Sequence, residues 1–326
     1  MSLYPLTFFP RFKERVWGGR RLADLFHKPL PPDVPIGESW EISDRPGDAS
    51  VIRNGPLAGR DLRWLMEQHG SELLGSPVAA GQRFPWLVKL LDASEDLSLQ
   101  VHPPAHRAAE LQGEPKSEMW YFADAAAGSR IFAGLRAGVT RDAFAGCVAD
   151  GTVADCLHTL SPQAGDAIFL PSGRVHALGA GTVVFEFQQN SDTTYRVFDW
   201  NRRGLDGRPR ELHLDASLRS IDFDDLAPAL AEVAWEGTRR PLVRNAVFHL
   251  DEWRFATAST LGDPRRPGAC AVLAVVSGAA QCRHPSGTVD LGPGDFVLLS
   301  AVMDAPIVDA EGGTTLLRML PAPAPS

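Results

Sequence analysis

The feature that most constrains this chain is a succession of short apolar segments interrupted by glycine and proline. The clearest segments are residues 84–93, 97–103, 117–124, 166–172, 182–189, 246–255, 270–278, 295–301 and 314–320. Short apolar strands separated by turn residues are typical of antiparallel barrels and sandwiches. The 326 residues include 30 glycines and 26 prolines, enough to place a turn after each segment. We therefore predict a mainly β protein.

Helical patterns are fewer. Residues 61–75 carry apolar side chains at helical spacing and end in glycine. Residues 103–113 begin with prolines and also end in glycine. Weaker helical patterns occur at residues 140–151 and 154–160. The sequence thus predicts a small helical portion beside the strands.

Two segments far apart in the chain resemble each other. Residues 165–176 read GDAIFLPSGRVH, and residues 294–305 read GDFVLLSAVMDA. Each has a Gly-Asp turn, an apolar strand and then a loop. The similarity predicts two barrels of one type, of which the first carries His176 where the second has Ala305.

The division between the two barrels is expected near residue 235, because residues 225–244 resemble a connector. We predict a first domain with the helical elements over residues 1–235 and a second barrel over residues 236–320. The last residues, 321–326, read PAPAPS and are expected to be a disordered tail.

Composition excludes several classes of partner. The net charge is −8 with both signs interspersed, so the sequence offers no basic stripe for nucleic acid or an anionic membrane. No apolar run approaches the roughly 20 residues of a membrane span, and the N-terminus lacks the pattern of a signal peptide. The four cysteines form no Cys-x-x-Cys pair and are expected to be free thiols. These features predict a cytoplasmic protein without nucleic-acid or membrane partners.

Residues 97–103 alternate between apolar and polar side chains. In a strand, Leu97, Leu99 and Val101 share one face. Ser98, Gln100 and His102 share the opposite face. A polar face of this kind is either the solvated side of a sheet or the wall of a site.

Two further side chains, Glu118 and His176, indicate that the polar face belongs to a metal site. Two imidazoles, a carboxylate and the Gln100 amide oxygen form a mixed nitrogen and oxygen donor set for a divalent cation. The absence of thiolates favours a catalytic metal over a closed structural one. Taken singly, a strand histidine is more often a hydrogen-bonded polar residue, and a glutamate beside aromatic residues is more often an ion-pair partner.

The spacing around His176 matches the second cupin motif, Gly-x5-Pro-x-Gly-x2-His, through Gly165, Pro171 and Gly173. The first cupin motif departs from the usual pattern, because Gln100-x-His102 replaces His-x-His and Glu118 lies farther downstream. These departures resemble one branch of the superfamily, the type I phosphomannose isomerases of the short bacterial kind. The matching segments are residues 12–19, 36–43, 84–93, 98–103, 116–121, 171–181, 188–200 and 208–214.

This resemblance implies a pair of cupin jelly-roll barrels with some helix packed on the first. It also implies one zinc ion per chain, or another divalent cation in its place, and Gln100 is the most variable ligand position in the short members. The implied ligands are Gln100, His102, Glu118 and His176. No metal is expected in the second barrel, where Ser300 and Ala305 replace the proline and histidine.

The reaction that the resemblance implies interconverts mannose 6-phosphate and fructose 6-phosphate through a cis-enediol, so the expected partner is a small sugar phosphate. Arg196 resembles the active-site arginine of the family and would meet the enediolate or the phosphate. The alternative for this residue is a structural ion pair with Asp192 or Asp199.

Further side chains complete the expected site. Lys116 shares a predicted strand face with Glu118 and is expected to hydrogen-bond the sugar or its enediolate. Glu186 aligns with a glutamate proposed as the base in longer relatives. Substrate contacts are expected from Lys89, which interrupts an apolar strand, from Ser98 and from Trp17.

Three other functions remain open at this point. The first is an isomerase of another sugar, including an unphosphorylated one. The second is a metal-dependent cupin dioxygenase, although such sites are generally rich in histidine and Gln100 fits them poorly. The third is a sugar-binding cupin without catalysis, which would not need the complete ligand set.

Overall fold

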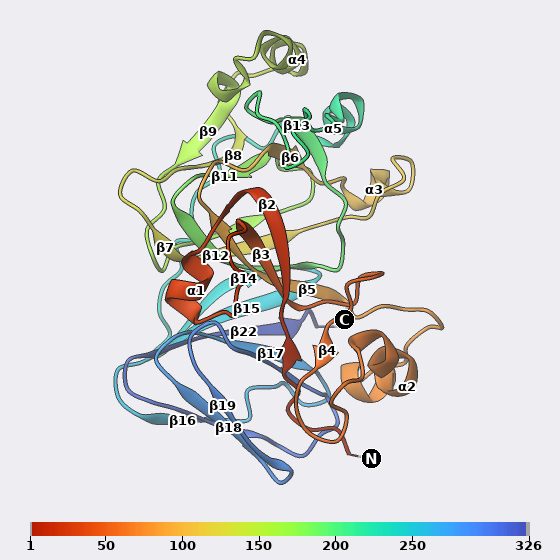
Figure 1. Cartoon of the computed structure of the whole chain (residues 1–326), viewed down its shortest axis with the longest axis vertical. Coiled ribbons are helices and arrows are strands. Elements are labelled where there is room, and N and C mark those ends of the chain that lie inside the picture. Colours follow the sequence, from red (N-terminus) through yellow and green to blue (C-terminus); the bar gives the residue numbers. More distant parts are fainter. Residues whose placement is uncertain (1, 324–326) are drawn as a thin grey trace.

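The computed structural model describes residues 2–323, which form mainly antiparallel β-sheets, as the sequence predicted (Figure 1). The first barrel has a six-stranded sheet facing a five-stranded one. The six-stranded sheet comprises β10 (Ala167–Leu170), β7 (Glu118–Ala125), β12 (Thr182–Gln189), β5 (Trp86–Ala93), β2 (Arg11–Gly19) and β3 (Ile36–Ile42). The five-stranded sheet comprises β13 (Tyr195–Phe198), β6 (Leu99–Val101), β11 (His176–Leu178), β8 (Ile131–Leu135) and β9 (Leu157–Leu160).

The second barrel also pairs two sheets and lies below the first in Figure 1. Its five-stranded sheet comprises β14 (Arg239–Arg244), β15 (Phe248–Phe255), β22 (Thr314–Pro321), β17 (Ala271–Ser277) and β20 (Phe296–Leu299). Its four-stranded sheet comprises β16 (Ser259–Gly262), β21 (Ile307–Ala310), β18 (Ala280–His284) and β19 (Gly287–Leu291). A short pair, β1 (Phe8–Phe9) and β4 (Val51–Ile52), completes the strands of the described residues.

Helices surround the sheets without entering the barrels. They are α1 (Arg21–Phe26), α2 (Leu62–Leu74), α3 (Ala105–Ala108), α4 (Arg141–Asp150), α5 (Leu214–Ser220) and the 3-10 turn η1 (Val153–Cys156). The Asp61 side chain caps α2 by accepting from the Trp64 amide at 2.8 Å, and Gly75 ends that helix at φ +78°. None of the helices over residues 2–323 is long and apolar enough to cross a membrane.

The central strands of the six-stranded sheet, β5, β7 and β12, are buried on both faces, which explains their nearly continuous apolar sequences. Val88 of β5 and Phe185 of β12 point to one face and join a core that also contains Leu250 and Leu317 of the second barrel. Neighbouring positions such as Trp120 point to the opposite face, into the first barrel. Successive side chains of a strand point to opposite faces of the sheet. When both faces are buried, both sets of side chains are apolar, and the strand sequence is apolar at successive positions.

The two barrels share more than this core. Leu6, near the N-terminus, exchanges two backbone hydrogen bonds with Leu298 of β20, at 3.0 and 2.9 Å. The chain therefore begins on the second barrel before it enters the first. Helix α2 also reaches the second barrel, because the Leu73 carbonyl accepts from the Ala301 amide at 2.9 Å.

The outer face of the five-stranded sheet in the first barrel is covered by α4 and α5. Leu99 and Val101 of β6 pack there against Phe144 of α4 and Ile221, which follows α5. The structure corrects one expectation about this strand. Leu97 lies before β6 and joins the cluster inside the barrel, so it does not share a face with Leu99 and Val101.

Several local predictions differ from the structure. Residues 154–160 are not a helix, because the turn η1 gives way to strand β9 at Leu157. The predicted helix over residues 103–113 is reduced to the four residues of α3. Strands β2 and β3 had no predicted counterpart, since their sequences, RFKERVWGG and IGESWEI, mix charged and apolar residues. For β2, β3 and β9 the cause is pairing with neighbouring strands, which overrides the local pattern.

The predicted connector, residues 225–244, ends in strand β14, which begins at Arg239. The proposed domain boundary near residue 235 therefore precedes the first strand of the second barrel. Of the predicted tail, Pro321 belongs to β22, and residues 324–326 lie outside the described residues.

Candidate metal centre and substrate cavity

Three buried side chains from separate parts of the chain converge inside the first barrel. His102 follows β6, Glu118 begins β7 and His176 begins β11. The His176 Nε2 atom lies 3.2 Å from Glu118 Oε1, and the His102 Nε2 atom lies 3.5 Å from Glu118 Oε2. One donor atom from each residue lies within 4.8 Å of the other two, which is a spacing that one cation can bridge.

The hydrogen bonds of the two imidazoles direct their lone pairs toward Glu118. The His102 Nδ1 group donates to the Thr193 carbonyl at 2.8 Å, and the His176 Nδ1 group donates to the Arg174 carbonyl at 2.9 Å. Each Nε2 atom then carries no proton and is an acceptor facing a carboxylate. Both oxygens of Glu118 are buried; Oε2 has the Lys116 ammonium at 2.6 Å, and Oε1 has no hydrogen-bond partner among the described residues. A divalent cation fits this arrangement, because it satisfies donor atoms that repel one another without it.

Gln100 completes the row across the five-stranded sheet. It is directly opposite His176 on β11 and directly opposite Arg196 on β13. The Gln100 amide nitrogen lies 3.3 Å from His176 Nε2, so this side chain reaches the cluster. Rotation of the amide by 180° would present its oxygen to a cation. The polar face predicted for residues 98–102 is thus the wall of a site.

Lys116 stands between the metal cluster and the open cavity. Its ammonium lies 2.6 Å from Glu118 Oε2 and 3.3 Å from His102 Nε2. Burial raises the pKa of the Glu118 carboxyl, but the Lys116 ammonium together with His102 and His176 outweighs it and holds the pKa well below its usual range. Burial and Lys116 lower the pKa of His102 to about 3. Both groups are therefore in the forms that bind a metal.

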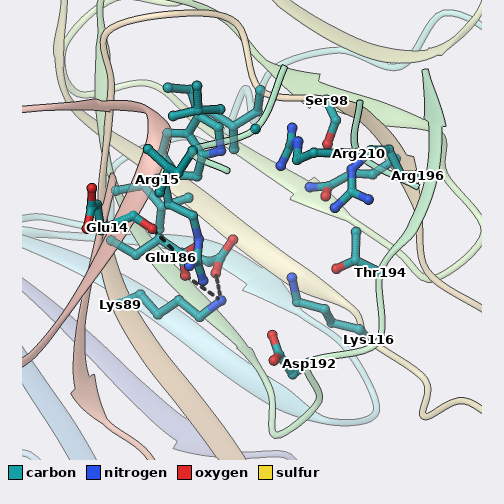
Figure 2. A pocket seen from close by; sticks show the side chains of 18 of the residues that line it. Glu14, Arg15, Lys89, Ser98, Lys116, Glu186, Asp192, Thr194, Arg196 and Arg210 are labelled. Atoms are coloured by element: carbon teal, nitrogen blue, oxygen red, sulfur yellow. Dashed lines mark hydrogen bonds and ion pairs between the residues drawn. The ribbon is translucent and has the colours of Figure 1, made fainter. Parts of the chain in front are cut away.

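A cavity of about 610 Å³ adjoins the cluster (Figure 2). Gln100 and Lys116 line it and also contact the cluster, which connects the two. The structure brings every sequence-predicted catalytic and substrate-binding side chain to this cavity. They are Trp17, Lys89, Ser98, Lys116, Glu186 and Arg196.

Lys89 and Glu186 form a buried ion pair at one side of the cavity. Lys89 Nζ lies 3.0 Å from Glu186 Oε2 and 3.6 Å from Glu38 Oε2. Burial lowers the pKa of Lys89, but the two carboxylates outweigh it and raise the pKa above its usual value. The other oxygen of Glu186 accepts from the Trp120 indole at 3.0 Å. Lys89 is thus a fixed cation already shared by two carboxylates.

Arg196 reaches the cavity from β13. Its Nη1 group donates to the Glu211 carbonyl at 2.6 Å, and its Nε atom is buried without a partner. Within residues 2–323 it forms an ion pair with neither Asp192 nor Asp199, so the structure does not support the alternative of a structural pair. Burial lowers the pKa of Arg196, and the charge of Arg210 lowers it further.

Five charged side chains of the cavity were not singled out from the sequence: Glu14, Arg15, Glu38, Asp206 and Arg210. Arg15 donates to Glu38 at 2.6 Å, and Lys89 and Arg15 together offset the burial of Glu38 and lower its pKa to about 2. Glu38 and Arg210 lie in segments that carried the family resemblance, IGESWEIS and RPRELHL. A charged residue within an otherwise apolar segment was the available signal for Glu38.

The fold and the cluster define the class: a cupin with one buried His-Glu-His metal site beside a charged cavity. The sequence profile of the phosphomannose isomerase type I catalytic domain matches residues 6–134. The mannose-6-phosphate isomerase ManA of Bacillus subtilis is 34% identical over 308 residues, which are 92% of this chain and 94% of ManA. The mannose-6-phosphate isomerase of Streptococcus mutans is 36% identical over 257 residues, 77% of this chain and 79% of that one.

The solved structures agree with the sequence comparisons. The crystal structure of the mannose 6-phosphate isomerase from Bacillus subtilis superposes with a TM-score of 0.87 at 31% identity, covering 98% of this chain and 99% of that one. The chain belongs to the type I phosphomannose isomerase family. The resemblance read from the sequence is confirmed, and the dioxygenase and non-catalytic alternatives are not favoured.

Proposed function

We propose that this protein is a metal-dependent isomerase that interconverts mannose 6-phosphate and fructose 6-phosphate in the cytoplasm. The observation that carries the proposal is the buried cluster of His102, Glu118 and His176 beside a cavity lined by cations. Membership of the type I family supports the substrate, because the relatives are named for mannose 6-phosphate.

We infer that zinc is the resident metal and that Gln100 joins the three clustered ligands. Neutral imidazoles and a carboxylate are donors that zinc accepts, although manganese or cobalt would also fit. When bound there, a divalent cation supplies positive charge that orients the sugar oxygens and stabilises an enediolate.

The protein's own side chains have distinct roles in this proposal. Glu186 moves the proton between C2 and C1, since it is a buried carboxylate on the cavity wall. Lys116 donates to a sugar oxygen, and Arg196 stabilises the negative charge of the enediolate. Their positions support these roles, because Arg196 is directly opposite Gln100 and Lys116 contacts the cluster.

The remaining side chains bind the substrate. Lys89 is held by Glu186 and Glu38, which suits it to a sugar hydroxyl beside the base. Ser98 offers a hydroxyl, and Trp17 offers an apolar wall, both almost fully buried at the cavity. These contacts would fix the open-chain sugar with C1 and C2 toward the metal end.

The test is a coupled assay on mannose 6-phosphate, with free mannose as the comparison and metal analysis of the purified protein. His176→Ala should lower the metal content and reduce kcat/KM by roughly 10³-fold or more. Activity that survives complete removal of metal would refute the mechanism. Equal kcat/KM for mannose and mannose 6-phosphate would refute the substrate.

A further inference from the structure

One wall of the cavity holds more arginine than carboxylate. Arg202 and Arg210 share the carboxylate of Asp199, with Arg202 Nη2 at 2.9 Å from Oδ1 and Arg210 Nε at 2.6 Å from Oδ2. Arg202 Nη1 also lies 3.5 Å from the exposed carboxylate of Glu95. Arg196 lies close enough to Arg210 to be repelled by it and has no carboxylate of its own. Arg196 and Arg210 line the cavity, and together with their neighbours Asp199 and Arg202 we call them the arginine wall. An anionic ligand would offset the surplus of positive charge at this wall.

Asp199 fixes the guanidinium of Arg210 without exhausting it. The Nε and Nη2 groups of Arg210 both donate to Asp199. The Nη1 group, by contrast, donates to no other side chain or carbonyl among residues 2–323. Since Arg210 also lines the cavity, these free donors are available to a ligand there. An arginine held in one orientation by a carboxylate loses little side-chain entropy when an anion binds.

The segment that carries Arg210 is itself anchored. The Trp200 indole donates to the Leu97 carbonyl at 2.7 Å, and Arg202 Nη1 donates to the Asp96 carbonyl at 2.6 Å. Near the tip, the Gly204 amide donates to the Arg208 carbonyl at 2.8 Å and closes a turn. The arginine wall is therefore preorganised before any ligand arrives.

The tip of the same loop brings one carboxylate, that of Asp206, to the cavity. That side chain is exposed and accepts from the Arg208 amide at 2.9 Å, so water and the backbone weaken its effect on the wall. The balance of charge at the wall stays positive.

The opposite side of the cavity is unsuited to a phosphate. Figure 2 shows Ser98, Arg196 and Arg210 grouped apart from Lys89 and Glu186. Lys89 is buried and paired with two carboxylates, so a dianion placed there would face Glu186 and Glu38 at close range. The arginine wall presents no comparable repulsion.

Arg196 and Arg210 also differ in what lies beside them. Arg196 is directly opposite Gln100 across the β13–β6 pair, which places it at the metal end. Arg210 comes from the loop that carries the exposed Leu205 at the cavity rim. A six-carbon sugar with C1 and C2 at the metal end carries its phosphate at the other end of the chain. That geometry separates the charge of the enediolate from the charge of the phosphate.

We propose that Arg210, held by Asp199, binds the substrate's phosphate and gives this protein its preference for phosphorylated over free sugars. This inference rests on the proposed isomerase function. In it, Arg210 is a specificity residue and Asp199 is the residue that positions it. Arg196 is left to the reacting end of the sugar.

The experiment compares Arg210→Met with Arg208→Met, a matched control from the same loop whose exposed side chain does not line the cavity. Arg210→Met should raise KM for mannose 6-phosphate about 10- to 100-fold with kcat nearly unchanged, because a charge-assisted contact to the non-reacting phosphate is lost. Competitive inhibition by inorganic phosphate should weaken by a similar factor. Any activity on free mannose should not change, and Arg208→Met should resemble the parent protein.

Two further variants keep the inference falsifiable if Arg210→Met does not fold. Arg210→Lys keeps the positive charge but lacks the planar, forked set of guanidinium N–H donors, and it should give an intermediate KM for mannose 6-phosphate. Asp199→Asn should raise KM less than Arg210→Met, since Arg210 then loses its orientation but remains present. An unchanged KM in Arg210→Lys and Arg210→Met overturns the inference, as does an equal loss on mannose and mannose 6-phosphate. Weaker phosphate inhibition with unchanged KM would also overturn it by indicating a separate anion site. Failure of the parent protein to isomerise mannose 6-phosphate would instead refute the proposed function.

Discussion

Residues 165–176 of the first barrel and residues 294–305 of the second begin with the same turn. The amides of Gly165 and Gly294 each donate to the neighbouring strand, to Phe122 and Val275 respectively, both at 2.8 Å. In each turn the aspartate side chain accepts an amide three residues earlier, at 2.8 Å for Asp166 and 2.9 Å for Asp295. The two barrels thus have the same turn, with the same hydrogen bonds, at corresponding places.

The two segments differ after the strand. In the first barrel the loop returns through β11 and brings His176 to Glu118. In the second barrel Ser300 donates to the Glu72 carbonyl at 3.1 Å, and Ala305 is exposed. The second interior is filled by apolar side chains, among them Leu273, Val297 and Leu316. A cupin barrel therefore acquires a site only where polar side chains replace this packing.

The largest difference between the barrels is expected when one buried carboxylate in each is replaced by an amide. Glu118→Gln should lower kcat/KM by roughly 10³-fold or more and reduce bound metal, because a neutral amide cannot balance the cation. Its thermal stability without metal should also fall, since the buried Lys116 ammonium loses the carboxylate that lies 2.6 Å from it. Steady-state kinetics and metal analysis are the measurements. Retained metal and activity would show that Glu118 is not a ligand.

The reciprocal substitution is Glu252→Gln in the second barrel. Glu252 is fully buried and satisfied by Tyr121 at 2.8 Å, Arg254 at 2.8 Å and Arg240 at 2.7 Å. Its loss should cost about 3 kcal/mol of unfolding free energy, because the arginines lose a buried partner. Urea unfolding measures the cost, and kcat should remain that of the parent. A loss of kcat with unchanged stability would contradict the division of roles between the barrels.

The charged interior of the first barrel should also make it sensitive to acid, since Glu38 lies among its charged side chains. Its pKa is about 2 in the folded protein, below its usual value of 4.5, because Lys89 and Arg15 outweigh burial. A depressed carboxyl pKa stabilises the fold above pH 4.5, and that stabilisation disappears as the pH falls toward 2. Glu38→Gln should therefore cost about 3 kcal/mol at pH 7, and the difference from the parent should shrink below about pH 4.5.

Urea unfolding of both proteins between pH 7 and pH 3 checks this prediction. A difference that stays constant down to pH 3 would contradict it. So would the absence of any difference at pH 7.

The smallest effect is expected at the shared turn. Asp166→Ala and Asp295→Ala each remove one side-chain acceptor for a backbone amide. Each should cost about 1 kcal/mol, and the two costs should be similar because the turns have the same hydrogen bonds. Thermal unfolding compares them. A cost several times larger in one barrel would show that the turns are not equivalent.

The mainly β fold and the likeness of the two turns could be predicted from the amino-acid pattern, and the residues of the metal cluster from that pattern together with the family resemblance. Strand periodicity places alternate side chains on opposite faces, so Gln100 and His102 were recognisable as one polar face. Gly165, Pro171, Gly173 and His176 lie within twelve consecutive residues, so their motif can be recognised in the sequence alone.

Which charged side chains meet could not be predicted before the fold was known. Glu38 and Lys89 come from β3 and β5, and Asp199 holds Arg210 across a loop, so no spacing in the chain predicts either pair. The same is true of strands β2 and β3, which are completed by pairing within the six-stranded sheet. The physical reason is that ion pairs and sheet contacts depend on distance in space. Side-chain periodicity, in contrast, is a property of the local backbone.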